Sequence, residues 1–170
     1  FVGSVEELQA AIDNFVNGQH ILFANDIKGS VFVKQNVDKD YIIDGNGYKL
    51  EGNIEINGDG RQAGLDSVTI KNVKFTTTQD AITFIDSEKQ KYDGKYNYAH
   101  NIYVENCSFE GAGANVMGLK IRQAKNVVVK NCVANVGHSL AQLYGCNGVT
   151  IDGVEVNAGR GISLGTSTNC

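Results

Sequence analysis

The chain of 170 residues contains no proline and no tryptophan, and no apolar run in it approaches the length of a membrane span. A helix needs about 20 consecutive apolar residues to cross a bilayer, so the sequence predicts no membrane-spanning segment. A basic excess is also missing, because 15 Lys and Arg residues stand against 19 Asp and Glu residues. We therefore expect no nucleic-acid partner, since proteins that bind duplexes concentrate positive charge on one face.

Cysteine is scarce, and the four cysteines lack the paired spacing of a zinc site. The chain instead has 20 glycines, many asparagines and 42% hydrophobic residues. Glycine and asparagine at this level indicate many tight turns, while the hydrophobic residues are enough for the core of a single domain.

One pattern recurs along the chain: an apolar-x-apolar strand, a short polar turn and a second such strand. Four copies read DSVTIKNVKF (66–75), HNIYVENCSF (100–109), KNVVVKNCVA (125–134) and NGVTIDGVEV (147–156), and YIIDGNGYKL (41–50) is a looser one. A third short strand follows each copy, at 53–56, 81–84, 118–121, 140–143 and 161–164. Such units bury their apolar faces only when they stack, about 4.8 Å apart. The sequence thus predicts an all-β chain of five to six coils with three strands each.

These repeats resemble the right-handed parallel β-helix of the pectate-lyase-like superfamily over roughly residues 20–170. The alignment places equivalent positions of neighbouring coils above one another. In the first strands these are Tyr41, Val68, Ile102, Val127 and Val149. In the third strands they are Ile54, Ile82, Leu119, Ala141 and Ile162.

The turn between the first two strands has a repeated composition. Asn72, Asn106 and Asn131 share one turn position and are predicted to stack as a ladder of amides, which ends where Gly153 replaces Asn. Cys107 and Cys132 follow in the inward position that Val73 and Val154 hold in other copies. Buried thiols that pack as small hydrophobic groups are the favoured interpretation, while a disulfide and a metal site stay open.

The two ends of the chain differ. Residues 1–18 are predicted to form a capping helix, with Ser4 and Glu7 as a capping box and Gly18 as the stop. Residues 19–170 are assigned to the coils. No closing element follows the last strand, so we expect the β-helix to continue beyond residue 170.

In the superfamily that the chain resembles, substrates lie along one parallel sheet on the outside of the coil. Alternation places two outward columns on the third strands: Glu55, Thr83, Lys120, Gln142 and Ser163, and beside them Asn57, Ile85, Arg122, Tyr144 and Gly165. Lyases of uronic-acid polymers neutralise a carboxylate and remove a weakly acidic proton, commonly with Arg, Lys, Tyr or His. The resemblance therefore implies Lys120, Arg122, Tyr144 and His138 as candidate catalytic residues, with a solvated sheet face as the alternative.

Other residues are candidates for contacts with a polysaccharide. Tyr92, Tyr96 and Tyr98 lie in an insertion at 86–100, where tyrosine rings can stack on sugars or form a protein interface, or where the loop is only solvated. The remaining candidates for substrate binding are Glu55, Thr83, Gln142 and Arg160. No metal ligand and no cofactor is assigned, although a Ca²⁺ ion bound through one or two carboxylates stays open.

Two functions remain open at this point. The first is an extracellular or cell-surface module that binds or processes acidic polysaccharide. If it is an enzyme, a lyase is favoured over a hydrolase, because Arg160 and a single Asp80 stand where polygalacturonases have a His and an Asp pair. The second is a non-catalytic rod, such as a cell-surface adhesin or a phage tail-fibre or tailspike module, that displays glycan-binding loops and, as a fibre, forms a homotrimer.

Overall fold

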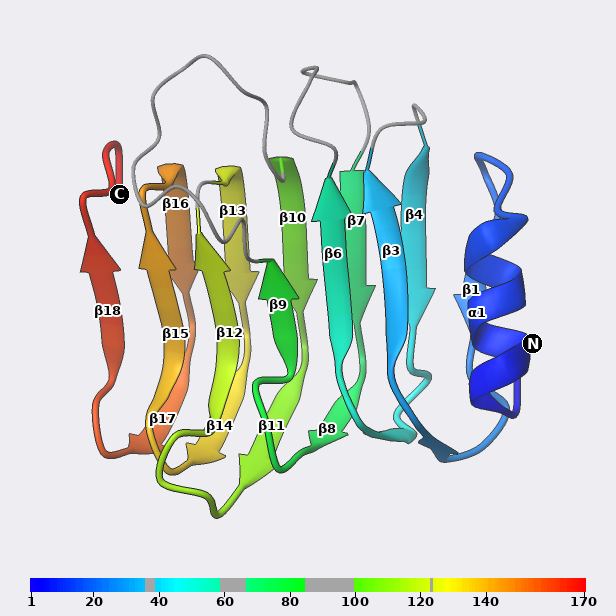
Figure 1. Ribbon diagram of the computed structural model, residues 1–170, viewed down its shortest axis with the longest axis horizontal. Coiled ribbons are helices and arrows are strands. Elements are labelled where there is room, and N and C mark those ends of the chain that lie inside the picture. The colour runs from blue at the N-terminus through cyan, green and yellow to red at the C-terminus, as the bar shows by residue number, and fades with distance from the viewer. Residues whose placement is uncertain (36–38, 59–66, 85–99, 123) are drawn as a thin grey trace.

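The computed structural model describes residues 1–35, 39–58, 67–84, 100–122 and 124–170. Within these residues the chain forms one helix and three parallel sheets of six strands each. It passes through one strand of each sheet and then returns to the first sheet, so successive coils stack along a common axis (Figure 1). The predicted parallel β-helix is confirmed.

Each sheet collects the equivalent strand from every coil. The first sheet contains β1 (Ile21–Leu22), β4 (Asp40–Asp44), β7 (Ser67–Lys71), β10 (His100–Glu105), β13 (Lys125–Lys130) and β16 (Asn147–Asp152). The second contains β2 (Ile27–Lys28), β5 (Lys49–Glu51), β8 (Lys74–Thr76), β11 (Ser108–Gly111), β14 (Val133–Val136) and β17 (Glu155–Ala158). The third contains β3 (Val31–Gln35), β6 (Ile54–Gly58), β9 (Ile82–Phe84), β12 (Met117–Arg122), β15 (Ser139–Tyr144) and β18 (Ile162–Gly165).

The register between coils agrees with the alignment of the repeats. In the first sheet, Val68 pairs with Tyr41 on one side and with Ile102 on the other, and Val127 continues the column. In the third sheet, Leu119 pairs with Ile82 and with Ala141. Register is strongly specified here because a slip of one residue would turn every inward side chain outward.

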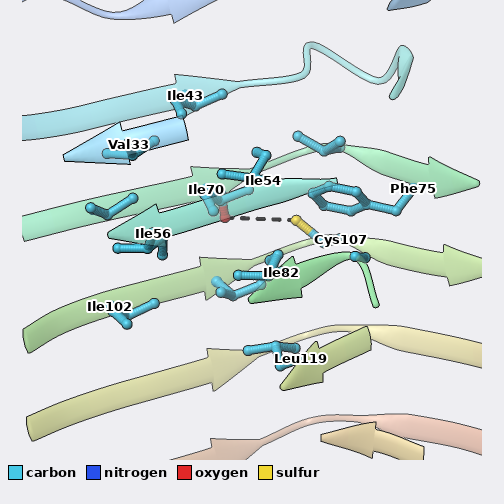
Figure 2. Packing of buried hydrophobic residues seen from close by; sticks show 14 of the residues in the cluster. Val33, Ile43, Ile54, Ile56, Ile70, Phe75, Ile82, Ile102, Cys107 and Leu119 are labelled. Carbon is cyan, nitrogen blue, oxygen red and sulfur yellow. Dashed lines mark hydrogen bonds between the residues drawn. The ribbon is translucent and has the colours of Figure 1, made fainter. Parts of the chain in front are cut away.

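The core consists of the inward side chains of all three sheets. Ile54, Ile70, Ile82 and Leu119 are fully buried and pack against one another across the coils (Figure 2). Phe75 and Phe109 stack with ring centroids 5.3 Å apart, one from β8 and the other from β11. Aliphatic columns and stacked rings bury apolar area continuously along the axis, which is the main stabilising contribution in such a repeat.

The third sheet departs from simple alternation at its beginning. Gly118 and Leu119 are consecutive in β12, and both are buried. A Cβ atom at Gly118 would lie 2.6 Å from the carbonyl oxygen of Leu140 and 3.1 Å from the Phe109 ring. A side chain at that position would not fit.

The N-terminal helix α1 (Val5–Asp13) packs on the first coil, against β1 and β3 (Figure 1). Ser4 Oγ accepts a hydrogen bond from the Glu7 amide at 3.2 Å, as the capping box predicts, and the Glu7 carboxylate accepts one from the Gly3 amide at 2.7 Å. The predicted end at Gly18 is wrong, because the helix ends at Asp13. Phe15 lies beyond it and is still buried, with its ring centroid 5.0 Å from that of Tyr41 and the two rings tilted by 36°.

The structure contains a coil that precedes the five recognised copies. Its strands β1 and β2 have only two residues each, so the repeat pattern cannot be recognised in their sequence. Ile21 and Ile27 supply its inward side chains. At the opposite end of the stack, Ile162 and Leu164 are 38% and 46% exposed, so the apolar interior is open there.

The stacked rings provide a test of the core. Replacing Phe109 with Ala should lower the free energy of unfolding by about 3–5 kcal/mol, because it removes a buried ring and leaves a cavity beside Phe75. Phe32→Ala is the matched control, since that ring is 56% exposed. Urea denaturation followed by circular dichroism measures both variants. Equal losses would contradict the assignment of the Phe75–Phe109 pair to the core.

Candidate functional site

The outer face of the third sheet carries the predicted columns in the expected register. Glu55 pairs with Thr83, Thr83 with Lys120, Lys120 with Gln142 and Gln142 with Ser163. In the second column, Arg122 pairs with Tyr144 and Tyr144 with Gly165. Thr83 is only 9% exposed, so it offers little surface to a ligand. Ile85 lies outside the described residues.

Arg122 and Tyr144 form the centre of this face. The Arg122 guanidinium carbon lies 5.9 Å from the centre of the Tyr144 ring, within the range of a cation–π interaction. The Tyr144 hydroxyl accepts a hydrogen bond from the side-chain amide of Gln142 at 3.3 Å. Arg122 Nε is buried and has no hydrogen-bond partner within the described part of the chain. A ligand from outside would therefore meet the terminal nitrogens of the partly exposed guanidinium group and not this buried atom.

Gly165 explains how the Tyr144 ring is accommodated. A Cβ atom at this position would lie 2.4 Å from the ring of Tyr144, which belongs to the coil before Gly165. Glycine at position 165 therefore leaves room for this ring. The ring is thus held between Arg122 of the coil before it and the bare backbone of the coil after it.

Lys120 lies beside this pair and has a partner of its own. Its ammonium group is 3.7 Å from the carboxylate of Asp80, in the preceding coil. The other oxygen of Asp80 accepts a hydrogen bond from the Met117 amide at 3.1 Å. Sequence reasoning treated Asp80 only as part of an incomplete hydrolase motif, and the long stretch of sequence between the two residues gave no sign of the contact. The carboxylate offsets the charge of Lys120 and leaves Arg122 as the cation without an acidic partner in this group.

The other sequence-predicted residues do not join this group. His138 lies just before β15, whereas Tyr144 ends it, and six residues of extended strand span roughly 20 Å. His138 Nδ1 is 3.0 Å from the hydroxyl of Ser139, and Arg160 is exposed in the next coil, where its amide bonds to the His138 carbonyl. Tyr92, Tyr96 and Tyr98 lie outside the described residues. Glu55 is partly exposed, but it belongs to a coil two steps away from Lys120.

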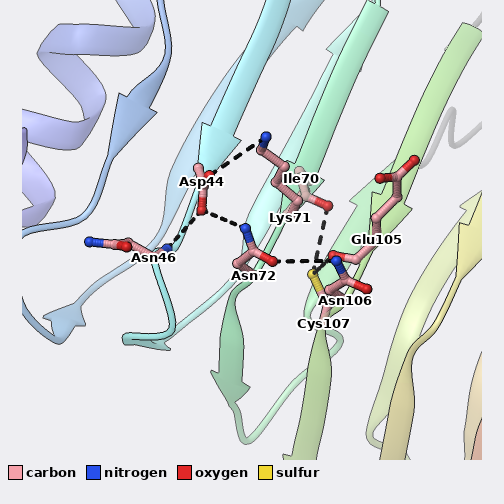
Figure 3. Close-up of polar contacts among 8 residues, drawn as sticks. All are labelled: Asp44, Asn46, Ile70, Lys71, Asn72, Glu105, Asn106 and Cys107. Atoms are coloured by element: carbon pink, nitrogen blue, oxygen red, sulfur yellow. Dashed lines mark hydrogen bonds and ion pairs between the residues drawn. The ribbon is translucent and has the colours of Figure 1, made fainter.

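A second polar feature is the ladder of turn amides. Asn72 Nδ2 donates to the Asp44 carboxylate at 2.9 Å, and Asn106 Nδ2 lies 3.5 Å from Asn72 Oδ1 (Figure 3). Asn72, Asn106 and Asn131 have φ values of 55°, 51° and 52°, a left-handed conformation that asparagine tolerates. Of the predicted ladder, the contact between Asn72 and Asn106 is present and Asp44 extends it by one coil, while no side-chain hydrogen bond joins Asn131 to Asn106 among the described residues. Gly153 takes the same conformation in the last coil, with φ 62°.

Sequence reasoning missed further amide contacts between coils, of which the pair on the first sheet is an example. Asn126 Nδ2 donates to Asn101 Oδ1 at 2.7 Å, and both residues also have positive φ, at 61° and 51°. In the next coil Gly148 occupies the equivalent position, with φ 80°. The signal was visible as an asparagine or glycine in the second position of the copies that begin at residues 100, 125 and 147.

The cysteines are placed as the favoured interpretation predicted. Cys107 and Cys132 are buried, and none of the four cysteines, all of which lie in the described ranges, forms a disulfide.

Across the described residues, no three His, Cys, Asp or Glu side chains gather in a way that could hold a metal ion. No helix in the described part of the structure is long and apolar enough to cross a membrane.

The carboxylate of Asp44, at one end of the amide ladder, accepts hydrogen bonds and lies near a positive charge. Burial raises its pKa, but hydrogen bonds from the Asn72 side chain and the Asn46 amide, together with the charge of Lys71 at 3.6 Å, outweigh this effect. The pKa of Asp44 therefore lies below its ordinary value of 3.8.

This lowered pKa predicts a pH-dependent contribution to stability. At pH values above the ordinary pKa of Asp44, the ionised carboxylate stabilises the folded state. This contribution is lost as the pH falls through the lower pKa that Asp44 has in the folded state. Wild type should be more stable than Asp44→Asn at neutral pH, and the difference should shrink in acid below pH 3.8. Lys71→Ala should lose only part of the effect, because the hydrogen bonds remain. Urea denaturation at a series of pH values measures the difference in the free energy of unfolding between wild type and Asp44→Asn. A difference that does not change with pH would refute the role of the charge.

Comparison of the chain with family models, curated proteins and solved structures gave no match. The assignment of the fold to a parallel β-helix therefore rests on the register of the coils themselves.

Proposed function

We propose that the protein binds an acidic polysaccharide along the outer face of its third sheet, as an extracellular module of the pectate-lyase-like kind. The observation that carries the proposal is the partly exposed Arg122 guanidinium over the Tyr144 ring, in a group whose carboxylate, Asp80, is paired with Lys120. A guanidinium group binds a carboxylate through two parallel hydrogen bonds, which makes uronic acids a suitable class of ligand.

The neighbouring groups fit the same class of ligand. Tyr144 offers a ring whose apolar surface can contact a sugar, and Gln142 holds its hydroxyl in place. Lys120 adds a second positive charge next to Arg122, and it can exchange its contact with Asp80 for a ligand carboxylate. These side chains come from β12 and β15, so a ligand that crosses the coils would meet them in succession.

Binding is favoured over cleavage by the position of His138. Elimination needs a base beside the proton next to the carboxylate, as well as positive groups to stabilise the charge that develops. His138 lies roughly 20 Å along the strand from Tyr144 and cannot act at Arg122. Within the described residues, Lys120 and Tyr144 are the candidate bases that remain close to Arg122.

A binding assay with polygalacturonate tests the proposal. Arg122→Ala should weaken binding by about 10-fold or more, since a hydrogen bond to a charged group contributes about 1.5–3 kcal/mol. Lys49→Ala is a matched control, because Lys49 is an exposed cation on the second sheet. Added salt should weaken the wild-type interaction, and a neutral polymer should not bind. Equal affinity of the two variants would contradict the proposed site.

The same samples separate binding from cleavage. Elimination creates a double bond in the product, which absorbs in the ultraviolet. A signal that Lys120→Ala abolishes and Lys49→Ala preserves would assign lyase activity to this face. Binding without such a signal would identify a non-catalytic module.

A further inference from the structure

The outer face of the third sheet carries an exposed ring and a cation at the end nearest the helix. Phe32 lies in β3, the outermost strand on that side, and its ring is 56% exposed. Phe32 pairs with Glu55 and so begins the outward column that leads to Lys120. Lys34 is also exposed and lies two positions further along β3, so it projects from the same face. The proposed binding face therefore extends as far as β3.

The helix fixes the backbone of β3 at Phe32. Gln9 Oε1 accepts a hydrogen bond from the Phe32 amide at 2.8 Å, and Gln9 Nε2 donates one to the Phe32 carbonyl oxygen at 3.0 Å. These backbone groups lie at the free edge of the sheet, since the Val31 amide bonds to the Asn53 carbonyl on the other side. Gln9 Nε2 also donates to the Asp13 carboxylate at 2.9 Å, which holds the Gln9 side chain. The exposed ring thus projects from an edge strand that is held in place.

The two ends of this face carry the same pair of chemical groups. At β12 and β15 they are the Arg122 guanidinium and the Tyr144 ring. At β3 they are the Lys34 ammonium and the Phe32 ring. Lys34 has no acidic partner among the described residues. Because a ring contacts the apolar face of a sugar and a free cation attracts a carboxylate, both ends fit the same repeating acidic ligand.

The middle of the face separates the two ends. Thr83, in β9, is only 9% exposed and offers little surface. Glu55, in β6, is partly exposed and lies in register with Phe32. Its carboxylate can accept hydrogen bonds from sugar hydroxyl groups but repels a carboxylate of the ligand. The acidic groups of a bound polymer are therefore expected at the two cationic ends.

The separation of the two ends sets a minimum length for the ligand. β3 and β12 are three steps apart in the sheet, with β6 and β9 between them (Figure 1). Neighbouring strands lie about 4.8 Å apart, so the two ends are separated by about 14 Å. One or two sugar units cannot bridge this separation, whereas a longer chain can. When one chain makes both contacts, the second contact forms intramolecularly, which raises the affinity of the whole chain.

We propose that Phe32 and Lys34 form a second subsite for the acidic polysaccharide, so that one polymer lies across the coils and binds both ends of the third sheet at once. This inference rests on the proposed function and adds a selection for chain length to it. At the second subsite the Phe32 ring contacts a sugar, the Lys34 ammonium pairs with a uronate carboxylate, and Glu55 accepts hydrogen bonds from hydroxyl groups.

Isothermal titration calorimetry with digalacturonate and hexagalacturonate tests the second subsite. The wild-type chain should bind the hexamer much more tightly than the dimer. Phe32→Ala should weaken hexamer binding by roughly 10-fold, because it removes an apolar contact with the sugar. Lys34→Ala should weaken it by roughly 2- to 5-fold, the range of an exposed ion pair. Val133→Ala and Lys49→Ala are the matched controls, since both are exposed side chains of the second sheet.

Arg122→Ala separates this inference from the proposed function, because it should weaken the binding of both ligands. Hexamer affinities of Phe32→Ala and Lys34→Ala equal to those of their controls would overturn the second subsite, and a loss in Arg122→Ala would then still support the first. Wild-type affinity in Arg122→Ala would overturn both. A wild-type chain that binds the hexamer no more tightly than the dimer would also overturn the second subsite. Circular dichroism checks that all the variants are folded.

Discussion

Backbone hydrogen bonds between neighbouring coils hold each residue above its equivalent in the coil before, and the rest of the structure depends on this register. The outer edge of the first sheet shows the consequence for charge. Asp44, Lys71, Glu105, Lys130 and Asp152 form one column in which the sign alternates from coil to coil. Opposite charges directly across a strand pair stabilise it and like charges destabilise it, so this column favours the observed register over its alternatives. The aliphatic columns inside act in the same direction.

The same register creates the candidate site. Arg122, Tyr144 and Gly165 come from three coils and belong to three copies of the repeat, and they meet only because the coils stack in register. A repeat that carries a different side chain at each copy of one position can build a continuous functional face on a uniform core. The buried thiols of Cys107 and Cys132 arise in the same way, from two copies that have cysteine where others have valine.

The sequence was sufficient to predict the coils, their register and the outward columns, because period-two alternation and a repeated turn specify both the direction and the alignment of each strand. It also predicted the helix start at Ser4 and the contact between Asn72 and Asn106. It could not predict the first coil, whose strands are too short to show alternation, or the helix end at Asp13, where Asn14 closes the helix ahead of Gly18. The contact of Lys120, in β12, with Asp80, which precedes β9, depends on how two coils lie in space, and no local pattern encodes it.

The sequence analysis grouped His138 with Arg122 and Tyr144, and strand geometry shows why this grouping was too broad. His138 comes just before β15 and Tyr144 ends it, so an extended chain separates them by roughly 20 Å. Residues that meet are those equivalent in neighbouring coils, such as Arg122 and Tyr144, and not those at opposite ends of one strand.

The central functional claim is that the outer face of the third sheet receives a carboxylate at Arg122. The most direct measurement is a crystal structure of the protein with an oligogalacturonate. The account predicts a sugar carboxylate within hydrogen-bond distance of the Arg122 guanidinium and a sugar ring in contact with Tyr144. An oligosaccharide bound to the first or second sheet, with Arg122 unoccupied, would contradict it.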